Sequence, residues 1–465
     1  MSAFDSSTPL TRFDQLVSYM EAGCTPKEQW RVGTEHEKFG FRKRDLTPIP
    51  YEGEAGIGRL LHNMADRYGW QRVEEAGHVI ALIKDGASVT LEPGGQLELS
   101  GAPLSTIHQT QDEINEHLNQ LGEVCRDLDI AFTGLGVQPK WPFKDIPWMP
   151  KGRYRVMREY LPTKGHLSLD MMARTCTVQA NFDFASETDM INKFRLAMAL
   201  QPLTTALFAN SPFVDGKPNG FLSYRAEIWR FTDPDRCGWL PFVFDDDFGF
   251  ARYVEYALDC PMLFLLEDGV YGHGGGIPFR AYLEGKHPAK PGVYPTVADW
   301  ETHLSTLFPD VRLKHYMELR GADAGNSRTL CALPALWKGL LHDDAALLAA
   351  WDRVKRWVPE ERNRIHLEAP RLGLQTRTPE GISFRALGLS ILEIARASLH
   401  RQAQRNAKGC DESIFLDPLF ITVEDNQTPA ERLLDAFKGR WKGAVEPIFW
   451  EEEFESFYAE CSKSS

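Results

Sequence analysis

Alternating polar and apolar residues mark five stretches of the chain as β-strands. The pattern occurs at VGTEHEKFGF, ASVTLEPGGQLELS, RTCTVQANFDF, SYRAEIWRF and HYMELRG, and it is typical of strands that bury one face. These stretches lie far apart, and the segments between them are helical or rich in proline and glycine. The arrangement favours an α+β fold with one mixed sheet assembled from distant pieces over a chain of βαβ units.

A period of 3.6 residues predicts helices in much of the remaining chain. Apolar residues have the spacing of an amphipathic helix over residues 13–20, 57–68 and 107–128. From about residue 333 onward the pattern is helical, and we expect these helices to pack around the sheet. The sequence has no internal repeat, low-complexity tract or linker, so residues 1–465 are expected to form a single domain with a mainly helical C-terminal portion.

Composition and charge narrow the class of protein. The 465 residues are 43% hydrophobic and 25% charged, which is ordinary for a globular protein. With 52 basic and 65 acidic residues the net charge is −13. Nucleic acids and anionic membranes would be repelled overall, so neither is expected as a partner.

The cysteines and the first residues indicate the compartment. Eight cysteines are spread along the chain without a CxxC pair, which argues against a zinc knuckle or a disulfide scaffold and is typical of a reducing compartment. The N-terminus lacks the basic and apolar regions of a secretory signal, and no apolar run is long enough to span a membrane. A cytoplasmic enzyme is therefore expected.

The polar faces of the predicted strands carry carboxylates, amides and guanidinium groups. Because residues two apart in a strand point to the same side, Glu35 and Glu37 share one face, and His36 points to the other as a core side chain. The Pro-Gly-Gly step between Glu92 and Glu98 allows a bulge that brings both to one side. The remaining polar positions are Thr177, Gln179 and Asn181 in one strand, and Glu318 and Arg320 in another.

Two interpretations of these faces compete. A solvated outer face is the common explanation for one polar strand, but such faces usually contain lysine, and these contain almost none. Side by side, the strands would form a concave acidic surface that is stable only when cations neutralise it. Oxygen ligands without cysteine or clustered histidine select Mg²⁺ or Mn²⁺. Because Mg²⁺ usually retains waters unless phosphates complete its octahedron, the expected ligand is a nucleoside triphosphate.

Two arginines provide positive charge on these faces. Arg320 shares a face with Glu318 and would contact a phosphate or a transferred phosphoryl group. Arg225 is expected to share a strand face with Glu227 and Trp229, where it would bind a substrate carboxylate. On pattern alone, a surface salt bridge explains Arg225 equally well.

Several familiar catalytic motifs are missing. The sequence contains no GxxxxGK[ST] P-loop, no GxGxxG that opens a helix and no HExxH after His36. YGHGGGIPF at 271–279 resembles an oxyanion-hole HGGG, but no GxSxG elbow accompanies it, so a mobile hairpin or loop tip is the better interpretation. Hydrolases of these classes and Rossmann oxidoreductases are therefore poorly supported.

The chain resembles glutamate–cysteine ligases of the plant and proteobacterial type in six ordered segments: VGTEHEKFGF, LEPGGQLELSGAPL, KDIPWMPKGRY, DMMARTCTVQANFDF, ANSPFVDGKPNGFLSYRAEIW and ELRGADAG. The resemblance runs from about residue 31 to about residue 341. It implies a glutamine-synthetase-like architecture, in which a curved, mainly antiparallel sheet forms a funnel with helices outside. It also implies ATP-dependent joining of the γ-carboxylate of L-glutamate to L-cysteine through γ-glutamyl phosphate, the first step of glutathione synthesis.

The resemblance further implies roles for individual residues. Glu37 and Arg320 would be catalytic, and Arg225 would bind the α-carboxylate of glutamate. Gln179 replaces a metal-binding histidine of the wider superfamily and, with Arg320, would contact the bound ATP and its metal. The substrate-binding set would be Arg225, Trp229, Thr177 and Asn181, and the Mg²⁺ or Mn²⁺ set would be Glu35, Glu37, Glu92, Glu98, Gln179 and Glu318.

The glycine-rich hairpin has two expected consequences. The acyl phosphate must be kept from water, and the tip at 271–276 is the candidate for a closing loop. Plant enzymes of this type carry a cysteine pair around this hairpin, and residues 271–292 contain none. No redox switch is expected there, which together with the missing transit peptide favours a bacterial cytosolic form.

Alternatives remain for function and assembly. A ligase on the same scaffold that joins glutamate to another amine would share the ATP and metal residues. A non-catalytic nucleotide or metal sensor would not need the full phosphoryl-transfer set. A monomer and a weak homodimer are both compatible with the sequence.

Overall fold

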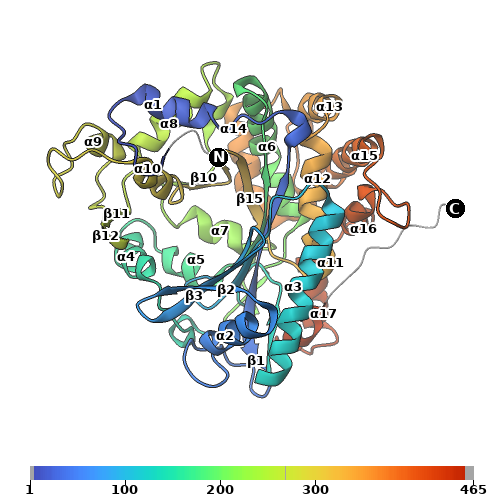
Figure 1. The fold of residues 1–465 in the computed structure, drawn as a ribbon. Coiled ribbons are helices and arrows are strands. Elements are labelled where there is room, and N and C mark those ends of the chain that lie inside the picture. Colours follow the sequence, from blue (N-terminus) through green and yellow to red (C-terminus); the bar gives the residue numbers. More distant parts are fainter. Residues whose placement is uncertain (1–4, 268, 456–465) are drawn as a thin grey trace.

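The computed structural model describes residues 5–267 and 269–455. Within these residues, nine strands form one sheet in the order β14-β15-β7-β1-β5-β4-β3-β2, and β6 pairs with the far end of β1 (Figure 1). Neighbouring strands of the sheet run antiparallel. The strands are β1 (Val32–Arg42), β2 (Gln71–Glu75), β3 (His78–Lys84), β4 (Ala87–Leu91), β5 (Leu97–Ser100), β6 (Ile130–Thr133), β7 (Thr177–Phe182), β14 (Val311–Leu313) and β15 (Met317–Asp323).

Three short strand pairs lie outside the main sheet in the described chain. Two are antiparallel and one is parallel. They are β8 (Phe213–Val214) with β9 (Lys217–Pro218), β10 (Cys237–Gly238) with β13 (Phe308–Pro309), and β11 (Phe264–Glu267) with β12 (Val270–His273).

Helices cover both faces of the sheet. One group, drawn to the left of the sheet in Figure 1, includes α4, α5 and α7, and a second group includes α3 and the C-terminal helices. The helices of the first 310 residues are α1 (Phe13–Glu21), α2 (Ile57–Tyr68), α3 (Ile107–Leu128), α4 (Gly152–Tyr160), α5 (Ser168–Arg174), α6 (Glu187–Leu207), α7 (Tyr224–Arg230), α8 (Phe250–Asp259), α9 (Phe279–Leu283) and α10 (Val297–Leu304).

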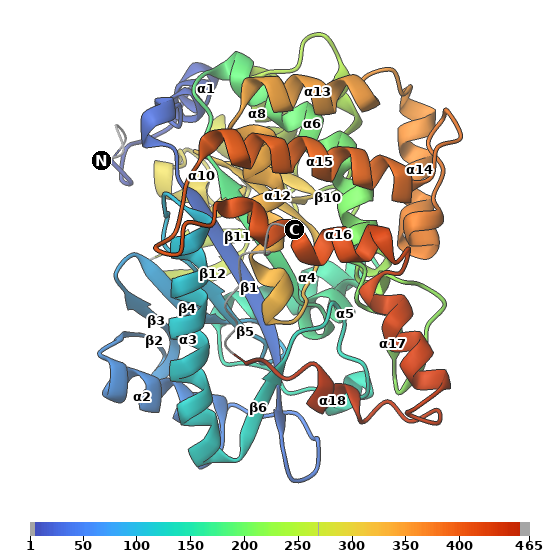
Figure 2. The same ribbon diagram turned by 90° about the vertical axis from the view of Figure 1, so that its right-hand side faces the viewer.

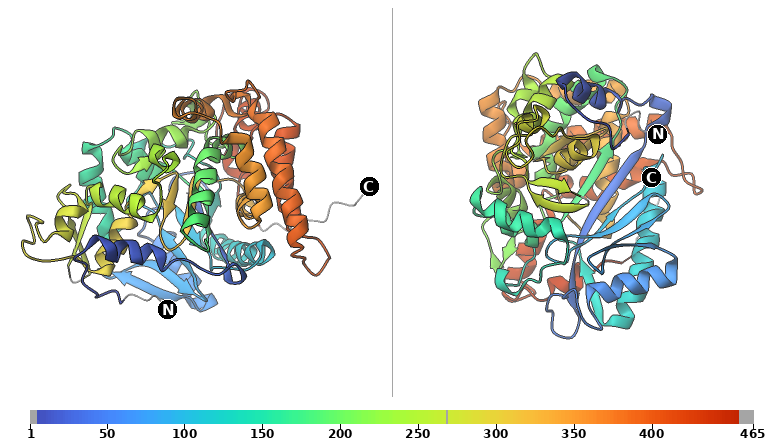
Figure 3. Two further views of the ribbon diagram at one scale, coloured as in Figure 1. Left: turned by 90° about the horizontal axis from the view of Figure 1, so that it is seen from above. Right: turned by 60° about the vertical axis from the view of Figure 1, so that its left-hand side comes forward.

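The C-terminal helices form an outer layer on one side of the molecule. Figure 2 shows α13, α15 and α16 lying over α12, and Figure 3 shows these helices gathered on one side. Every residue of α12 is buried, as expected for an apolar helix that connects a sheet to an outer layer. These helices are α11 (Ser327–Leu330), α12 (Ala332–Leu341), α13 (Asp344–Val354), α14 (Pro359–Leu372), α15 (Phe384–Gln402), α16 (Asp417–Glu424), α17 (Pro429–Lys438) and α18 (Ile448–Glu451).

Most predicted elements are confirmed. The helices at 57–68 and 107–128 have the predicted bounds, and the chain is helical from residue 332 onward. Four of the five predicted strands are present in the antiparallel sheet, so the predicted α+β fold with a mainly antiparallel sheet and surrounding helices is correct. No helix of the described residues is long and apolar enough to cross a membrane.

One predicted strand is wrong. SYRAEIWRF forms α7, whose N-cap residue Ser223 accepts a hydrogen bond from the amide of Ala226 through its hydroxyl, at 3.4 Å. Because residues four apart share a helix face, Arg225 lies beside Trp229, 5.7 Å from the ring centre. Glu227, two residues from each, is not on that face.

The cysteines are mostly free, as expected without a disulfide scaffold. One departure is Cys410, which is disulfide-bonded, and Cys461 lies outside the described residues. The free cysteines are Cys24, Cys125, Cys176, Cys237, Cys260 and Cys331.

Candidate active site

The register of three central strands brings the predicted polar residues together. Glu37 on β1 lies opposite Glu98 on β5, and Glu35 lies opposite Gln179 on β7. On the other side of β7, Asn181 lies opposite Glu318 of β15. The residues that alternation placed on one face therefore meet on one face of one sheet.

This face forms the floor of a cavity of about 180 Å³. Two predicted residues, Asn181 and Glu318, are not part of its wall. Asn181 lies behind it and donates a hydrogen bond through Nδ2 to Glu35 Oε1 at 2.8 Å. The predicted residues that line the cavity are Glu35, Glu37, Glu92, Glu98, Thr177, Gln179, Arg225, Trp229 and Arg320.

Glu318 is a carboxylate whose charge the protein compensates. It is fully buried, and Arg312 donates to both of its oxygens at 2.7 Å. Arg320 Nη1 donates to Oε1 at 2.6 Å, and Lys314 Nζ lies 3.3 Å from Oε2. Burial acts to raise the pKa of Glu318, but these three cations outweigh it and lower the pKa well below its usual value.

Glu35, Glu37 and Glu98 lack such compensation. Burial raises the pKa of Glu35 to about 7, and the negative charges of Glu318 and Glu98 add to the shift. Burial, followed by Glu92 and Glu98, raises the pKa of Glu37 well above its usual value, and burial and Glu92 raise that of Glu98. The nearby charges of Lys314 and Arg225 oppose these shifts without outweighing burial, and no described residue forms a salt bridge with Glu35, Glu37 or Glu98. A bound cation would complete the charge balance.

Hydrogen bonds hold the uncompensated carboxylates in place. The amide of Thr177 donates to Glu37 Oε2 at 2.9 Å. The hydroxyls of Thr90 and Ser100 donate to the two oxygens of Glu98 at 3.0 and 2.9 Å. Their positions are therefore fixed by neighbouring strands before any ligand binds.

Arg320 connects the compensated and uncompensated parts of the face. Its Nη1 donates to Gln179 Oε1 at 2.7 Å as well as to Glu318. Its guanidinium lies 5.7 Å from the ring centre of Trp229 and 5.8 Å from that of Phe308, which restricts its orientation. The predicted proximity of Arg320 and Glu318 is confirmed.

Three basic residues of the cavity wall were not predicted from the sequence. Arg312 approaches from β14, and Lys151 and Arg153 approach from the start of α4. Arg153 lies over the rings of Phe264 and Tyr271 at 5.3 and 5.9 Å. The KGR sequence was visible in the proline-rich loop, but nothing in its spacing indicated that it faces the sheet.

His36 lies on the opposite face of β1, as predicted. Its side chain is fully buried, with its ring centre 5.9 Å from that of His117 and its Nδ1 3.2 Å from Lys38 Nζ. Burial, followed by the charge of Lys38, lowers the pKa of His36 well below its usual value. His36 is therefore a neutral core side chain.

The glycine-rich hairpin lies next to the site. Strand β12 packs against α4, and His273 Nε2 lies 2.7 Å from Glu159 Oε2. Gly275 and Gly276 have φ values of 68° and 66°, which other residues rarely adopt. The tip can therefore turn sharply beside the basic end of α4.

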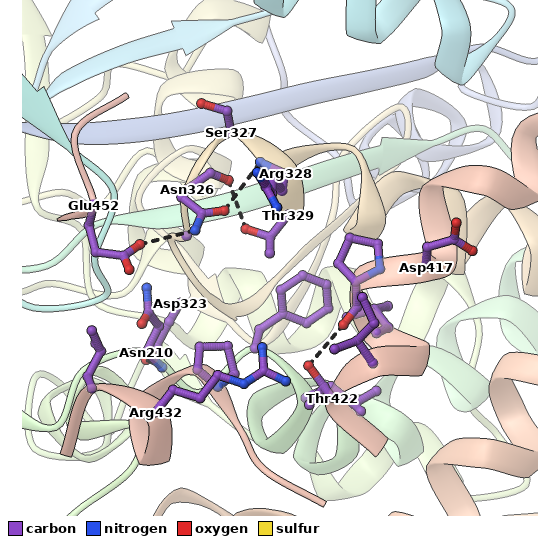
Figure 4. Close-up of a pocket in the computed structure, with 18 of the residues that line it drawn as sticks. Asn210, Asp323, Asn326, Ser327, Arg328, Thr329, Asp417, Thr422, Arg432 and Glu452 are labelled. Atoms are coloured by element: carbon purple, nitrogen blue, oxygen red, sulfur yellow. Dashed lines mark hydrogen bonds between the residues drawn. The ribbon is translucent and has the colours of Figure 1, made fainter. Parts of the chain in front are cut away.

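A larger cavity, of about 1090 Å³, lies elsewhere, between the end of β15 and the C-terminal helices α16 and α17 (Figure 4). None of the predicted site residues lines it. Its buried carboxylate, Asp323, already accepts hydrogen bonds from the hydroxyls of Ser211 and Ser223 at 2.6 and 2.8 Å. Size alone does not identify the site, and the uncompensated charge favours the smaller cavity.

Comparisons with known proteins identify the family. The family model described as glutamate-cysteine ligase family 2 (GCS2) matches residues 31–451. A chloroplastic glutamate–cysteine ligase of Brassica juncea is 51% identical over 446 residues, which cover 96% of this chain and 85% of that protein. The Arabidopsis thaliana chloroplastic enzyme is 50% identical over 446 residues, which cover 96% and 83%.

A solved structure shows the same fold. The glutamate–cysteine ligase of Francisella tularensis, determined in complex with AMP, aligns with a TM-score of 0.52 and 14% sequence identity over 91% of this chain and 87% of that chain. The curated relatives are named chloroplastic, and this contradicts the expectation of a cytoplasmic protein. The N-terminal pattern and cysteine spacing on which that expectation depended do not determine a compartment. The chain belongs to the glutamate–cysteine ligase family 2, whose activity is the synthesis of γ-glutamylcysteine in the first step of glutathione biosynthesis.

Proposed function

We propose that the carboxylate-lined cavity uses ATP to activate the γ-carboxylate of L-glutamate as γ-glutamyl phosphate, which L-cysteine then attacks through its amine. The observation that carries this proposal is the group of uncompensated carboxylates beside a basic wall. ATP with a divalent cation supplies the charges that this arrangement lacks. The AMP complex of the Francisella tularensis structure supports an adenine nucleotide as the ligand.

The donor set of the cavity fits a hard divalent cation. Its uncompensated donors are oxygens, from Glu35, Glu37, Glu92 and Glu98, and oxygen-only sets prefer Mg²⁺ or Mn²⁺. In the ligand-free arrangement, no three His, Cys, Asp or Glu side chains of the described residues are grouped to hold a metal ion. Bound Mg²⁺ would neutralise the carboxylates and the ATP phosphates and polarise the transferred group.

Gln179 and Glu318 would join the ligands only after a rearrangement. Arg320 donates hydrogen bonds to the side-chain oxygen of Gln179 and to one oxygen of Glu318. If Arg320 moved to a phosphate, the side-chain oxygen of Gln179 would become available to the metal, whereas Arg312 would still donate to Glu318 Oε1. In the ligand-free protein, the hydrogen bonds to Gln179 and Glu318 fix the position of the Arg320 guanidinium above the sheet.

Arg225 and its neighbours provide the glutamate site in this proposal. Arg225 is 3% exposed, and its Nε has no hydrogen-bond partner among the described residues. A buried donor of this kind favours a ligand carboxylate. Trp229 provides an apolar wall beside it, and Thr177 provides a polar contact from β7. Asn181 is outside the cavity wall and would act only through its hydrogen bond to Glu35.

The chain contributes to the reaction by positioning and charge. Glutamate's γ-carboxylate and the γ-phosphate of ATP are both anionic, so Lys151, Arg153 and Arg320 would lower their repulsion and stabilise the transferring phosphoryl group. Glu37, fixed by the amide of Thr177, would hold the cation nearest the reacting groups. Closure of the tip at 271–276 would exclude water from the acyl phosphate.

The proposal treats residues 1–465 as one catalytic domain, either a monomer or a weak homodimer. One of the buried core clusters contains residues from Leu10 to Val423, and this spread along the chain supports the single domain. The C-terminal layer packs on the same helices, α6 and α12, that contact the sheet.

ADP release tests the proposed function directly. Purified protein with Mg²⁺ and ATP should release ADP when glutamate and cysteine are both present, with γ-glutamylcysteine as the product. Other amines in place of cysteine would reveal a different acceptor. Absence of cysteine-dependent turnover with Mg²⁺ present would overturn the proposal.

A further inference from the structure

A second cavity, of about 250 Å³, adjoins the carboxylate-lined cavity. The two share four wall residues, Arg225, Trp229, Phe308 and Arg320. The residues that line only the second cavity include no metal-type carboxylate cluster, so this space does not fit the Mg²⁺ and phosphates. It lies where a second substrate would approach an acyl group held beside Arg225 and Arg320.

Helix α14 of the C-terminal layer forms one wall of this second cavity. Asn363, His366, Leu367 and Pro370 line it, with the i, i+3, i+4, i+7 spacing of one helix face. The C-terminal third, where the resemblance was weakest, therefore contributes side chains to the site.

His366 faces a carboxylate across the cavity wall. Its Nδ1 lies 3.6 Å from Asp310 Oδ2, and both side chains are partly exposed, at 23% and 18%. An acidic neighbour at Nδ1 favours the tautomer with the proton on Nδ1, which leaves the lone pair of Nε2 free to accept a proton. Among the described residues the structure shows no hydrogen bond to Nε2.

The proposed reaction requires a proton acceptor at this position. An α-amino group is mostly protonated at neutral pH, and an ammonium group cannot attack a carbonyl carbon. The carboxylates of the first cavity cannot take this proton while they bind a cation. The other charged groups lining the second cavity are Arg225, Glu227, Arg230, Asp310 and Arg320.

We propose that the second cavity binds the acceptor amino acid and that His366 Nε2 takes the proton from its ammonium group, with Asp310 as the positioning residue. The inference rests on the proposed function. The free amine then attacks the γ-carbonyl carbon of γ-glutamyl phosphate, so that the C–N bond forms and the C–O bond to phosphate breaks. The nitrogen loses two protons in forming the amide. His366 takes the first, and the departing phosphate takes the second.

Two neighbouring groups are weaker candidates for this base. Glu227 lies 3.3 Å from Arg230 Nη2, so its carboxylate is already engaged in an ion pair. Burial raises the pKa of the Cys237 thiol, so it does not form the thiolate that could accept a proton. His366 is the one histidine among the described residues that line this cavity, and imidazole is the side chain most often used as a general base.

A comparison of two acceptors tests the inference. Hydroxylamine is largely unprotonated at neutral pH and needs no base, whereas cysteine does. In His366→Gln, the kcat with cysteine should fall about 100-fold, within the range of general base catalysis, while γ-glutamyl hydroxamate formation from hydroxylamine stays within about threefold. The cysteine rate of the variant should also continue to rise at alkaline pH, where the amine deprotonates by itself.

Matched variants make the outcome decisive. His400→Gln removes an exposed histidine whose Nδ1 lies 2.7 Å from Asp411, far from this cavity, and should change neither rate. Asp310→Asn should also lower the kcat with cysteine and leave the hydroxylamine rate nearly unchanged, but its effect on the cysteine reaction should be smaller than that of His366→Gln.

Three results would overturn the inference. His366→Gln could lose the same rate with cysteine and with hydroxylamine, or lose no rate with either acceptor. The third is a selective loss of the cysteine reaction in Glu227→Gln but not in His366→Gln. Failure of the unmodified protein to release ADP with glutamate and hydroxylamine would instead overturn the proposed function, and the inference with it.

Discussion

Two sets of carboxylates on the same sheet face have opposite electrostatic environments. Glu318 is fully buried but is surrounded by Arg312, Lys314 and Arg320, and its pKa is lowered. Glu35 and Glu37, two strands away, are partly buried, and burial raises their pKa values. Burial is common to both sets, so the difference comes from the cations.

The comparison separates structural charge from functional charge. A buried carboxylate with its own cations holds a fixed position at little net gain in stability. Buried carboxylates without cations are unfavourable in the ligand-free protein, and proteins retain such groups where a ligand completes the charge balance. The first set positions Arg320, and the second set is where the divalent cation is expected.

The largest expected effect on activity is from Glu37→Gln. This change keeps the size of the side chain and the hydrogen bond from Thr177 but removes the charge, so ADP release should fall at least about 100-fold, since loss of outer-sphere partners alone costs 10- to 100-fold. Glu393→Gln, at an exposed position of α15, is the matched control. A near-normal rate in Glu37→Gln would remove Glu37 from the site.

Arg312→Met should produce the largest loss of stability. The change removes the guanidinium group that donates to both oxygens of the buried Glu318. Breaking such a buried ion pair lowers the free energy of unfolding by about 3–5 kcal/mol. Urea denaturation measures this directly. The double variant Arg312→Met with Glu318→Met should lose less than Arg312→Met alone, and an equal or greater loss would show that Glu318 does not depend on Arg312.

The pH dependence of stability should reveal the uncompensated set. The pKa of Glu35 is about 7 in the folded protein, above its ordinary 4.5, so the folded state holds this proton more tightly than the unfolded state. The stabilisation is complete below the ordinary value and is lost as pH rises through about 7. Without metal, the unfolding temperature should fall by a few degrees between about pH 5 and about pH 8.

Magnesium provides the control for this prediction. At about pH 8 it should raise the unfolding temperature more than at about pH 5, because only ionised carboxylates bind it. A metal-free protein whose unfolding temperature rises over this pH range would contradict the raised pKa values.

The smallest expected effect is from His36→Asn. His36 points away from the cavity and is neutral, so the rate of ADP release should stay within about threefold. Loss of ring packing against His117 should cost about 1–2 kcal/mol of stability, measured by denaturation. A loss of activity comparable to that of Glu37→Gln would mean that the two faces of β1 do not have separate roles.

The polar face of the sheet could be predicted from sequence because alternation in a strand is local. Glu35 and Glu37 share a side in any strand with this sequence, and the same holds for Glu318 and Arg320. The prediction for SYRAEIWRF is wrong because alternation over nine residues does not exclude a short helix, and Ser223 provides the N-cap of that helix. The segment that contains Arg225 is therefore a helix.

Several basic residues of the site could not be predicted, for a physical reason. Arg312 compensates Glu318 across a hairpin, and Lys151 approaches from a loop more than a hundred residues away from β15. His366 lies on a helix whose pattern indicates only an amphipathic face. Long-range placement of this kind depends on packing and not on spacing, so the sequence revealed the acidic residues with Arg225 and Arg320, but not the other basic residues of the site.

Calorimetric titration of the metal-free protein with Mn²⁺, at about pH 8 and with a non-hydrolysable ATP analogue present, tests the central claim most directly. The uncompensated carboxylates should bind the ion in the unmodified protein and in His36→Asn with equal affinity, and Glu37→Gln should weaken binding at least about 100-fold. Equal Mn²⁺ affinity in Glu37→Gln and the unmodified protein would contradict the account.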